Sequence, residues 1–200
     1  MNLLKKLFNV KRKSVFKSKQ TDHSRYFPED KLPIDEKFTY NFNKNGGKFL
    51  YCENDKEILE AFDNILLEND WYEKDVFLIN EKLSTKFDGF NLNFCKSKDA
   101  SFLLSTCESL VANSGAILLS SNQIKEKKLN ELPINFVIFA TTSQLVDTIS
   151  EGMRKIKKQS KNYFPSNITT IQDFETEKEK DFLSYGSSAK NLYLLLLEDL

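Results

Sequence analysis

The sequence predicts an α/β fold: a three-layer α/β/α domain with a mostly parallel sheet, preceded by a basic N-terminal arm. From Lys48 onward, short apolar runs alternate with segments of helical periodicity, and apolar strands without internal alternation are usually buried on both faces of a sheet. Short connections between the runs favour right-handed strand–helix–strand units. The first 20 residues carry seven basic side chains and no acidic one. We therefore divide the chain into an arm, 1–45, and a compact domain, 46–200.

Six apolar runs predict buried strands, because each is short and continuous. They lie at 49–52, 76–79, 101–104, 116–119, 136–140 and 168–171. A short segment around 106–111 follows the third run. The run 192–197 fits a buried strand or a buried helix equally, since periodicity does not distinguish the two in so short a stretch.

Two helices are predicted from capping patterns and apolar stripes. Asn54 and Glu57 have the spacing of a capping box, in which side chains bond the free backbone N–H groups at a helix start. The stripe that follows consists of Ile58, Leu59, Phe62, Ile65 and Leu66. Thr141 and Gln144 have the same spacing and predict a second helix start. Its inner stripe would be Leu145, Val146, Ile149, Met153 and Ile156.

Composition excludes several classes of protein. The 29 basic and 29 acidic residues cancel, which argues against a general nucleic-acid binder. No apolar run approaches the roughly 18 residues of a membrane-spanning helix. Three widely spaced cysteines, Cys52, Cys95 and Cys107, exclude a disulfide scaffold and a Cys-x-x-Cys metal site and fit a reducing cytoplasm. Without a glycine-rich phosphate loop, ATP and NAD sites are unsupported, so we expect no metal and no cofactor.

The arm separates from the domain by charge. Residues 1–20 sum to +7 and residues 21–200 to −7, since 22 basic side chains there face 29 acidic ones. Leu3, Leu4, Leu7 and Phe8 recur at helical spacing beside the first lysines, a pattern that fits contact with an anionic membrane surface or a partner. A solvated arm is favoured, because the apolar stretch is short and charge runs usually face water. The only histidine, His23, also lies in the arm.

Polar residues follow four of the predicted strands. They are Ser105-Thr106, Ser120-Ser121-Asn122, Thr141-Thr142-Ser143 and Gln172-Asp173. In parallel sheets ligands usually bind beyond the carboxyl ends of the strands, and hydroxyls with backbone N–H groups can hold a carboxylate or phosphate there. The same residue types also cap helices and fill turns. Both interpretations stay open.

The second half of the chain resembles the lactate-utilisation (LUD) domain family, C-type. The resemblance rests on four segments: 102–119, which contains Ala112-Asn113-Ser114-Gly115-Ala116 where the family has Ala-Glu-Thr-Gly-Thr, 132–139, 143–146 and 190–199. It covers roughly 100–200, and 46–99 more loosely. It implies a fold like that of ribose-5-phosphate isomerase, glucosamine-6-phosphate deaminase and the CoA transferases, and it makes the run 192–197 a strand. It also implies iron–sulfur lactate-oxidation proteins as partners.

This chain departs from the family at its polar positions. Asn113 replaces a glutamate, which removes a candidate general base or nucleophile, and Asn135 replaces a histidine. Gly186-Ser187-Ser188-Ala189 stands where the family has Gly-His-Gly-Pro, and 172–181 replaces a family stretch that begins Gly-Pro-Ser. The candidate ligand-binding residues are Thr106, Asn113, Ser114, Gly115, Ser120, Asn135, Thr141, Gly186 and Ser187. Glu108 and Asp173 are the catalytic candidates.

Three functions remain after the sequence is considered. The first is an accessory component of lactate or organic-acid utilisation that binds a small anion or an iron–sulfur partner at the carboxyl edge of the strands, without catalysis. The second is an isomerase- or CoA-transferase-like enzyme that uses carboxylates at the same edge. The third is a module held to a membrane or a partner by its arm. The replaced glutamate and histidines favour the first.

Overall fold

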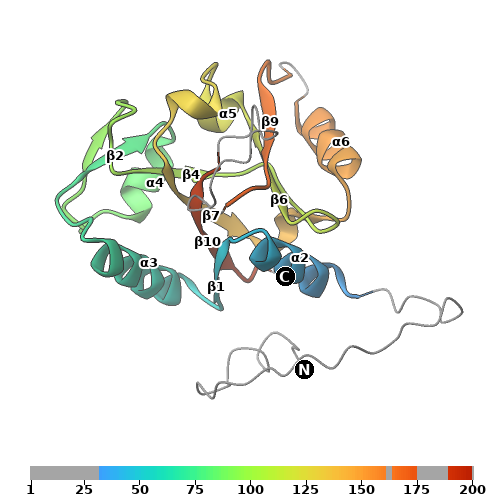
Figure 1. The fold of residues 1–200 in the computed structure, drawn as a ribbon, viewed down its shortest axis with the longest axis horizontal. Helices are drawn as coiled ribbons and strands as arrows, with labels where there is room; N and C mark the ends of the chain where they lie inside the picture. Colours follow the sequence, from blue (N-terminus) through green and yellow to red (C-terminus); the bar gives the residue numbers. More distant parts are fainter. Residues whose placement is uncertain (1–31, 161–163, 175–188, 200) are drawn as a thin grey trace, which may run out of the picture.

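The computed structural model describes residues 32–160, 164–174 and 189–199. At their centre lies a six-stranded parallel sheet in the order β1-β10-β7-β4-β2-β3 (Figure 1). Its strands are β1 (Lys48–Cys52), β2 (Asp75–Leu78), β3 (Asn93–Cys95), β4 (Phe102–Thr106), β7 (Asn135–Thr141) and β10 (Asn191–Leu197). The predicted α/β class is confirmed, and the leucine run forms the strand between β1 and β7.

Helices α3 (Asp55–Asn69) and α4 (Glu81–Lys86) cover one face of this sheet (Figure 1). The predicted start of α3 is confirmed: Asn54 Oδ1 accepts a hydrogen bond from the Glu57 N–H at 3.0 Å, and Glu57 accepts one from the Glu53 N–H at 2.8 Å. The apolar stripe of α3 packs on the sheet together with Trp71, whose ring stacks on Phe102 at 4.7 Å.

A second sheet covers the other face, where the sequence predicts helices. It has four strands in the order β8-β5-β6-β9. Their bounds are β5 (Ser109–Val111), β6 (Ala116–Ser120), β8 (Leu145–Val146) and β9 (Ile168–Ile171). A tight turn at Gly115, with φ of +66°, folds β5 and β6 into an antiparallel hairpin, so β6 does not join the parallel sheet. The outer face of this second sheet packs against α6 (Ile149–Gln159).

The helix predicted to start at Thr141 begins later. Thr142–Gln144 form a single 3₁₀ turn, η2, and Leu145–Val146 form the extended strand β8, which pairs with β5. Helix α6 starts at Ile149, where Thr148 accepts a hydrogen bond from the Glu151 N–H at 3.3 Å. Thr141 and Gln144 therefore cap this 3₁₀ turn and not an α-helix. Two other short elements are α5 (Ser121–Ile124) and η1 (Leu129–Glu131).

Packed residues begin before the domain boundary expected at residue 46. Helix α2 (Ile34–Lys44) belongs to the stretch assigned to the arm, yet Phe38 and Phe42 are fully buried in the core between the two sheets. Their rings stack at 5.3 Å, and Phe42 meets Phe174 at 4.8 Å. The basic segment 1–20 and His23 lie outside the described residues. Within the described part of the chain, no helix is long and apolar enough to cross a bilayer.

Candidate functional site at the carboxyl edge

The carboxyl ends of β7 and β10 meet in a dense polar network centred on Asp199. Its carboxylate accepts hydrogen bonds from the Thr142 hydroxyl at 2.8 Å, the Ser143 N–H at 2.8 Å and the Ser143 hydroxyl at 2.7 Å. Thr141 lies 3.0 Å from the Ser143 hydroxyl. Partial burial raises the pKa of Asp199, but the bonds from Ser143 and Thr142 outweigh it and lower that pKa to about 2. Asp199 is therefore ionised at neutral pH.

A positive charge reaches the same turn from α6. Lys155 Nζ donates to the Ser143 carbonyl at 2.9 Å and to the Leu145 carbonyl at 3.4 Å. Among the described residues it forms no ion pair with a carboxylate. Lys155 and Asp199 thus contact opposite groups of one residue, Ser143. The Lys155 ammonium donates to backbone carbonyls of this turn, and the Asp199 carboxylate accepts from its hydroxyls.

A second carboxylate lies at the end of the neighbouring strand β4. Glu108 Oε1 accepts hydrogen bonds from the Ser120 hydroxyl at 2.5 Å and the Asn122 side chain at 2.9 Å. Gln144 joins this group to the η2 turn, because its side chain donates to the Cys107 carbonyl at 2.5 Å and accepts from the Thr141 N–H at 2.8 Å. The structure therefore brings three predicted residues, Thr141, Ser120 and Glu108, to the same edge; Thr106, the last residue of β4, lies there as well.

Next to Asp199 the edge is acidic. The Tyr51 hydroxyl is hydrogen-bonded to Glu198, and burial, that bond and the charges of Glu198, Glu53 and Asp35 together raise the pKa of Tyr51 above its usual value. These carboxylates come from the ends of β10 and β1 and from the start of α2. A negative charge placed against these carboxylates with no cation beside it would be repelled, since two like charges 4 Å apart cost about 4 kcal/mol at the dielectric typical of protein surfaces.

Two predicted residues lie at the opposite, amino edge of the sheet. Asn135 begins β7, donates to the Ser101 carbonyl at 2.8 Å and accepts from Asn191 at 3.0 Å. The Asp173 carbonyl accepts from the N–H of Lys190, the residue before β10. Strand β9 belongs to the second sheet and is antiparallel to β6, so its end does not share an edge with the ends of β4 and β7. The expectation that all four strand ends lie together is therefore wrong for β9.

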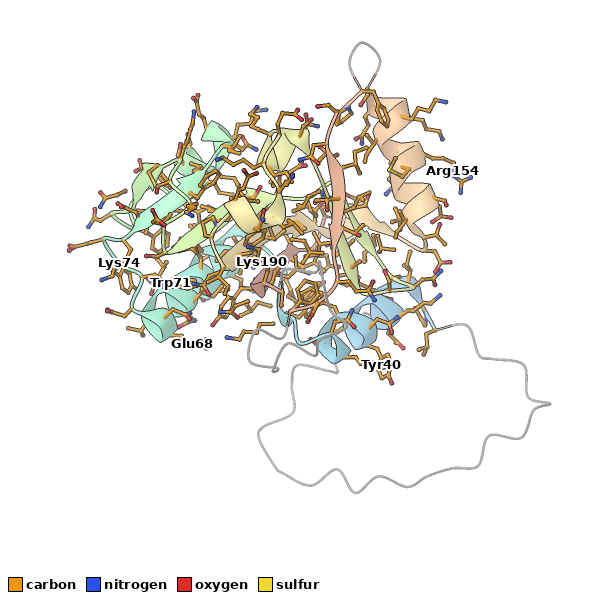
Figure 2. The ribbon with its side chains drawn as sticks, turned by 45° about the horizontal axis from the view of Figure 1, so that its top comes forward. Tyr40, Glu68, Trp71, Lys74, Arg154 and Lys190 are labelled. Atoms are coloured by element: carbon orange, nitrogen blue, oxygen red, sulfur yellow. The ribbon has the colours of Figure 1, made fainter. Side chains whose placement is uncertain are left out.

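Lys190 is the buried cation of this amino edge. It is 3% exposed and donates to the carbonyls of Leu132 at 3.1 Å and Pro133 at 2.8 Å. Figure 2 places it between the layers, while Arg154 on α6 and Tyr40 on α2 point outward. Burial lowers the pKa of Lys190 to about 8. Because its ammonium donates to two backbone carbonyls and lies 5.2 Å from the centre of the Phe136 ring, we infer that Lys190 fixes the segment that enters β7.

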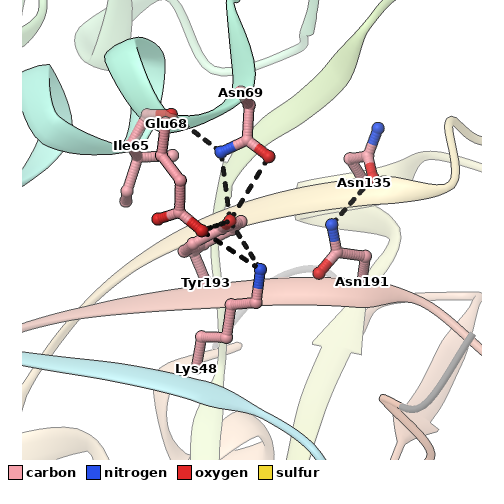
Figure 3. A network of polar contacts seen from close by, with 7 residues as sticks. All are labelled: Lys48, Ile65, Glu68, Asn69, Asn135, Asn191 and Tyr193. Atoms are coloured by element: carbon pink, nitrogen blue, oxygen red, sulfur yellow. Dashed lines mark hydrogen bonds and ion pairs between the residues drawn. The ribbon is translucent and has the colours of Figure 1, made fainter.

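A further polar network joins the amino ends of β1 and β10 to the end of α3 (Figure 3). Lys48 Nζ donates to the Tyr193 hydroxyl at 2.6 Å and lies 3.7 Å from a Glu68 oxygen, and Asn69 donates to Tyr193 at 3.0 Å. Donors and acceptors in this network satisfy one another. It holds α3 on the sheet, and nothing in it points to a ligand.

The turn that resembles the family motif packs against α2. The Asn41 side chain donates to the Ala112 carbonyl at 2.8 Å, and that of Asn45 donates to the Ser114 carbonyl at 2.7 Å. A Cβ on Gly115 would meet the Asn41–Phe42 backbone at 2.4 Å. Asn113, Ser114 and Gly115 are thus used to dock the hairpin on α2.

Sequence reasoning missed Asp199 and Lys155. Asp199 follows the run 192–197 by two residues, so assigning that run as a strand was enough to bring it to the carboxyl edge. No comparable signal marks Lys155, because its position depends on where α6 starts. Gly186 and Ser187 lie outside the described residues.

Fold and site together define an α/β protein with a parallel sheet whose carboxyl edge is polar and carries both signs of charge. A family model of the LUD domain matches residues 91–196. That is more than half of the 200 residues, and the chain therefore belongs to the LUD-domain family, as the sequence predicts. Family membership relates the chain to lactate utilisation.

Comparison of structures agrees on the fold. The chain is similar to a DUF162 family protein from Deinococcus radiodurans, with a TM-score of 0.57 and 14% sequence identity. The similarity covers 83% of this chain and 96% of that one. At this identity the likeness concerns the fold alone. No curated protein matches the sequence.

Proposed function

We propose that this LUD-domain chain is a non-catalytic accessory protein of lactate oxidation, which binds a small 2-hydroxy acid at the carboxyl ends of β7 and β10. One observation carries the proposal: Lys155 and Asp199 contact the same residue, Ser143, from its carbonyl and its hydroxyl side. Lactate oxidation to pyruvate releases two electrons, and iron–sulfur proteins are the acceptors that the family implies. The chain would present or retain the acid for such a partner.

The two charges select the ligand class. A carboxylate placed at Lys155 gains a charge-assisted hydrogen bond. Asp199 opposes a second negative charge but accepts a hydrogen bond from a ligand hydroxyl, because its carboxylate is ionised at neutral pH. A 2-hydroxy acid carries both groups on adjacent carbons. Sulfate has charge without a hydrogen-bond donor, and a 2-oxo acid lacks the hydroxyl.

A ligand panel in thermal unfolding tests this function. We expect millimolar lactate to raise the melting temperature of the full chain, because a ligand that binds only the folded state stabilises it. Propionate matches lactate without the hydroxyl, and it should give a smaller shift, as should pyruvate. Equal shifts with sulfate would reveal plain charge binding. No shift of the melting temperature with lactate at about 10 mM would contradict the proposal.

A second candidate function is favoured by Glu108. Two hydrogen bonds fix its Oε1 at the carboxyl edge, and fixed carboxylates serve as nucleophiles or general bases. We infer that any isomerase- or transferase-like turnover would use this residue. Asp173 does not share its edge, so the pair is not a two-carboxylate site. Glu108→Gln should abolish turnover found with CoA thioesters or sugar phosphates, whereas Asp173→Asn should leave it unchanged; the reverse pattern would refute this assignment.

A further inference from the structure

The face of the parallel sheet that packs on α3 and α4 ends in a row of half-buried side chains. Alternate residues of a strand share a face, so Val137, Phe139 and Thr141 of β7 all lie on this one. In the strand registers, Thr106 of β4 lies beside Phe139, and Leu197 of β10 lies beside Thr141. Val137, deeper in the sheet, is fully buried, whereas Thr106, Phe139 and Leu197 are each half-buried. We call these three residues the edge row.

The edge row adjoins the candidate site. Thr141, the register partner of Leu197, has its hydroxyl 3.0 Å from the Ser143 hydroxyl. The Ser143 hydroxyl in turn donates to Asp199 at 2.7 Å. Leu197 is therefore the apolar neighbour of the group that would receive the ligand hydroxyl. The row is continuous with the proposed ligand site and does not form a separate surface.

The Phe139 ring is held in place from the side of α4. Lys86 Nζ lies 4.8 Å from the centre of this ring, and the Phe87 ring meets it edge-on with 6.4 Å between the centres. Lys86 is also hydrogen-bonded and ion-paired to Asp55 at the start of α3, so its charge is already balanced. The edge row therefore offers apolar contact beside the site and does not offer a second site for an anion.

The spacing along β10 favours an acid larger than lactate. The Glu198 N–H donates to the Cys52 carbonyl at 2.9 Å, so the extended pairing of β10 with β1 continues past Leu197. The step from Asp199 back to Leu197 is then about 6.6 Å, the distance between alternate residues of a strand. The methyl group of lactate is too short to cover this step, whereas an isobutyl group on the same carbon covers most of it.

We propose that the edge row is the side-chain subsite of the bound acid, and that the ligand is a 2-hydroxy acid with a branched apolar side chain. This inference rests on the proposed function, because Lys155 and Asp199 orient the carboxylate and the hydroxyl. The side chain of the acid contacts Leu197 and Phe139, and Thr106 borders it from β4. Each buried methylene group strengthens binding about fourfold, so an acid that reaches the row binds more tightly than lactate.

Calorimetric titration of the full chain with two acids tests the proposal. Lactate and 2-hydroxy-4-methylpentanoate share the carboxylate and the hydroxyl and differ only in the side chain. We expect the larger acid to bind at least tenfold more tightly than lactate. 4-Methylpentanoate, which lacks the hydroxyl, should bind more weakly than the larger hydroxy acid. Equal affinity of these two would show that the apolar group binds independently of the Lys155–Asp199 site, and it would overturn the proposal.

Three variants locate the subsite. Leu197→Ala should reduce the ratio of the two affinities to about threefold or less, and Thr106→Leu should reduce it by filling the row from the neighbouring strand. Leu92→Ala is the matched control, because Leu92 is also half-buried against the same face but directly precedes β3 at the amino edge. It should keep the wild-type ratio. A ratio measured within one variant does not depend on the fraction of chains that is folded.

The outcomes separate this inference from the proposed function. If lactate binds and the wild-type ratio is close to one, the proposed function stands and the subsite is wrong. If neither hydroxy acid binds, both are wrong. A high ratio that persists in Leu197→Ala and in Thr106→Leu would place the side chain of the acid elsewhere and overturn the subsite. Binding of the larger acid with lactate too weak to measure, abolished in Leu197→Ala and kept in Leu92→Ala, would support it.

Discussion

At the scale of single residues, two fully buried serines illustrate opposite situations. Among the described residues, the Ser109 hydroxyl has no hydrogen-bond partner. Its oxygen lies 3.4 Å from the position that a Cβ on Gly152 of α6 would take. The Ser120 hydroxyl is bonded to Glu108 and caps α5 through the Asn122 N–H. A buried unpaired polar group costs about 1–3 kcal/mol, whereas a satisfied one contributes about 1 kcal/mol.

We predict that Ser109→Ala raises the free energy of unfolding by about 1 kcal/mol, because it removes an unpaired hydroxyl without opening a large void. Ser120→Ala should lower it by about 1–2 kcal/mol, since a helix cap and a bond to Glu108 are lost. Urea unfolding followed by circular dichroism measures both. Loss of stability in Ser109→Ala similar to that in Ser120→Ala would show that the Ser109 hydroxyl has a partner after all.

Lys190 gives the protein a pH dependence in the alkaline range. Burial lowers its pKa from 10.5 to about 8, so between these values the unfolded chain binds more protons than the folded one. Stability attributable to this group should therefore rise as pH increases from about 8 to about 10.5. Lys190→Met removes the titrating group. We predict that the stability difference between wild type and Lys190→Met changes in favour of wild type over this range in urea unfolding; a constant difference would contradict the lowered pKa.

At the scale of elements, the β5–β6 hairpin depends on Gly115. Its φ of +66° is unfavourable for other residues, and an added Cβ would meet the α2 backbone at 2.4 Å. Gly89 also has a positive φ, +102°, but nothing lies within 4 Å of its Cβ position. Both glycines have a positive φ, but only Gly115 lies close to the α2 backbone. A substitution at each position therefore distinguishes the cost of backbone strain from the cost of the close approach.

We predict that Gly89→Ala lowers stability by about 1–2 kcal/mol, from backbone strain alone. Gly115→Ala should lower it by several kcal/mol, roughly 3 or more, because α2 must move away from the hairpin. Thermal and urea unfolding compare the two variants. Equal losses would mean that α2 is not tightly docked on the Asn113–Gly115 turn.

Helices and strands could be predicted from the sequence where a continuous apolar run or a capping pattern marks them clearly. The continuous apolar runs at β4 and β7 and the Asn54 cap of α3 needed no tertiary information, whereas the run that forms β10 is assigned as a strand only through the family resemblance. The second sheet could not be predicted in this way: Leu145 and Val146 fit the apolar stripe of a helix, and their pairing with Leu110 and Val111 decides for a strand. Propensity in such a short segment is overridden by a long-range contact.

At the scale of the whole molecule, the candidate site depends on the topology more than on any motif. The edge shared by β4, β7 and β10 brings Glu108, Thr141 and Asp199 to neighbouring positions, and parallel strands allow that to be expected from the order of elements. Asn135 and Asp173 lie at the amino edge. Asn135 is the first residue of β7, and Asp173 follows β9, which belongs to the second sheet. Lys155 comes from a third layer, which the sequence does not position.

The charge distribution also belongs to this scale. Zero net charge is the sum of a basic segment, 1–20, and an acidic remainder, and the described carboxyl edge carries part of that acidic excess.

The central claim is that Lys155 and Asp199 hold a 2-hydroxy acid, and calorimetric titration of lactate into a matched pair of lysine variants tests it most directly. Lys155→Met removes the ammonium that contacts Ser143, and Lys157→Met removes an exposed lysine of the same helix and the same charge. We predict that Lys157→Met binds lactate like wild type and that Lys155→Met binds it at least tenfold more weakly. Equal affinity of both variants, or no binding by wild type, would contradict the account.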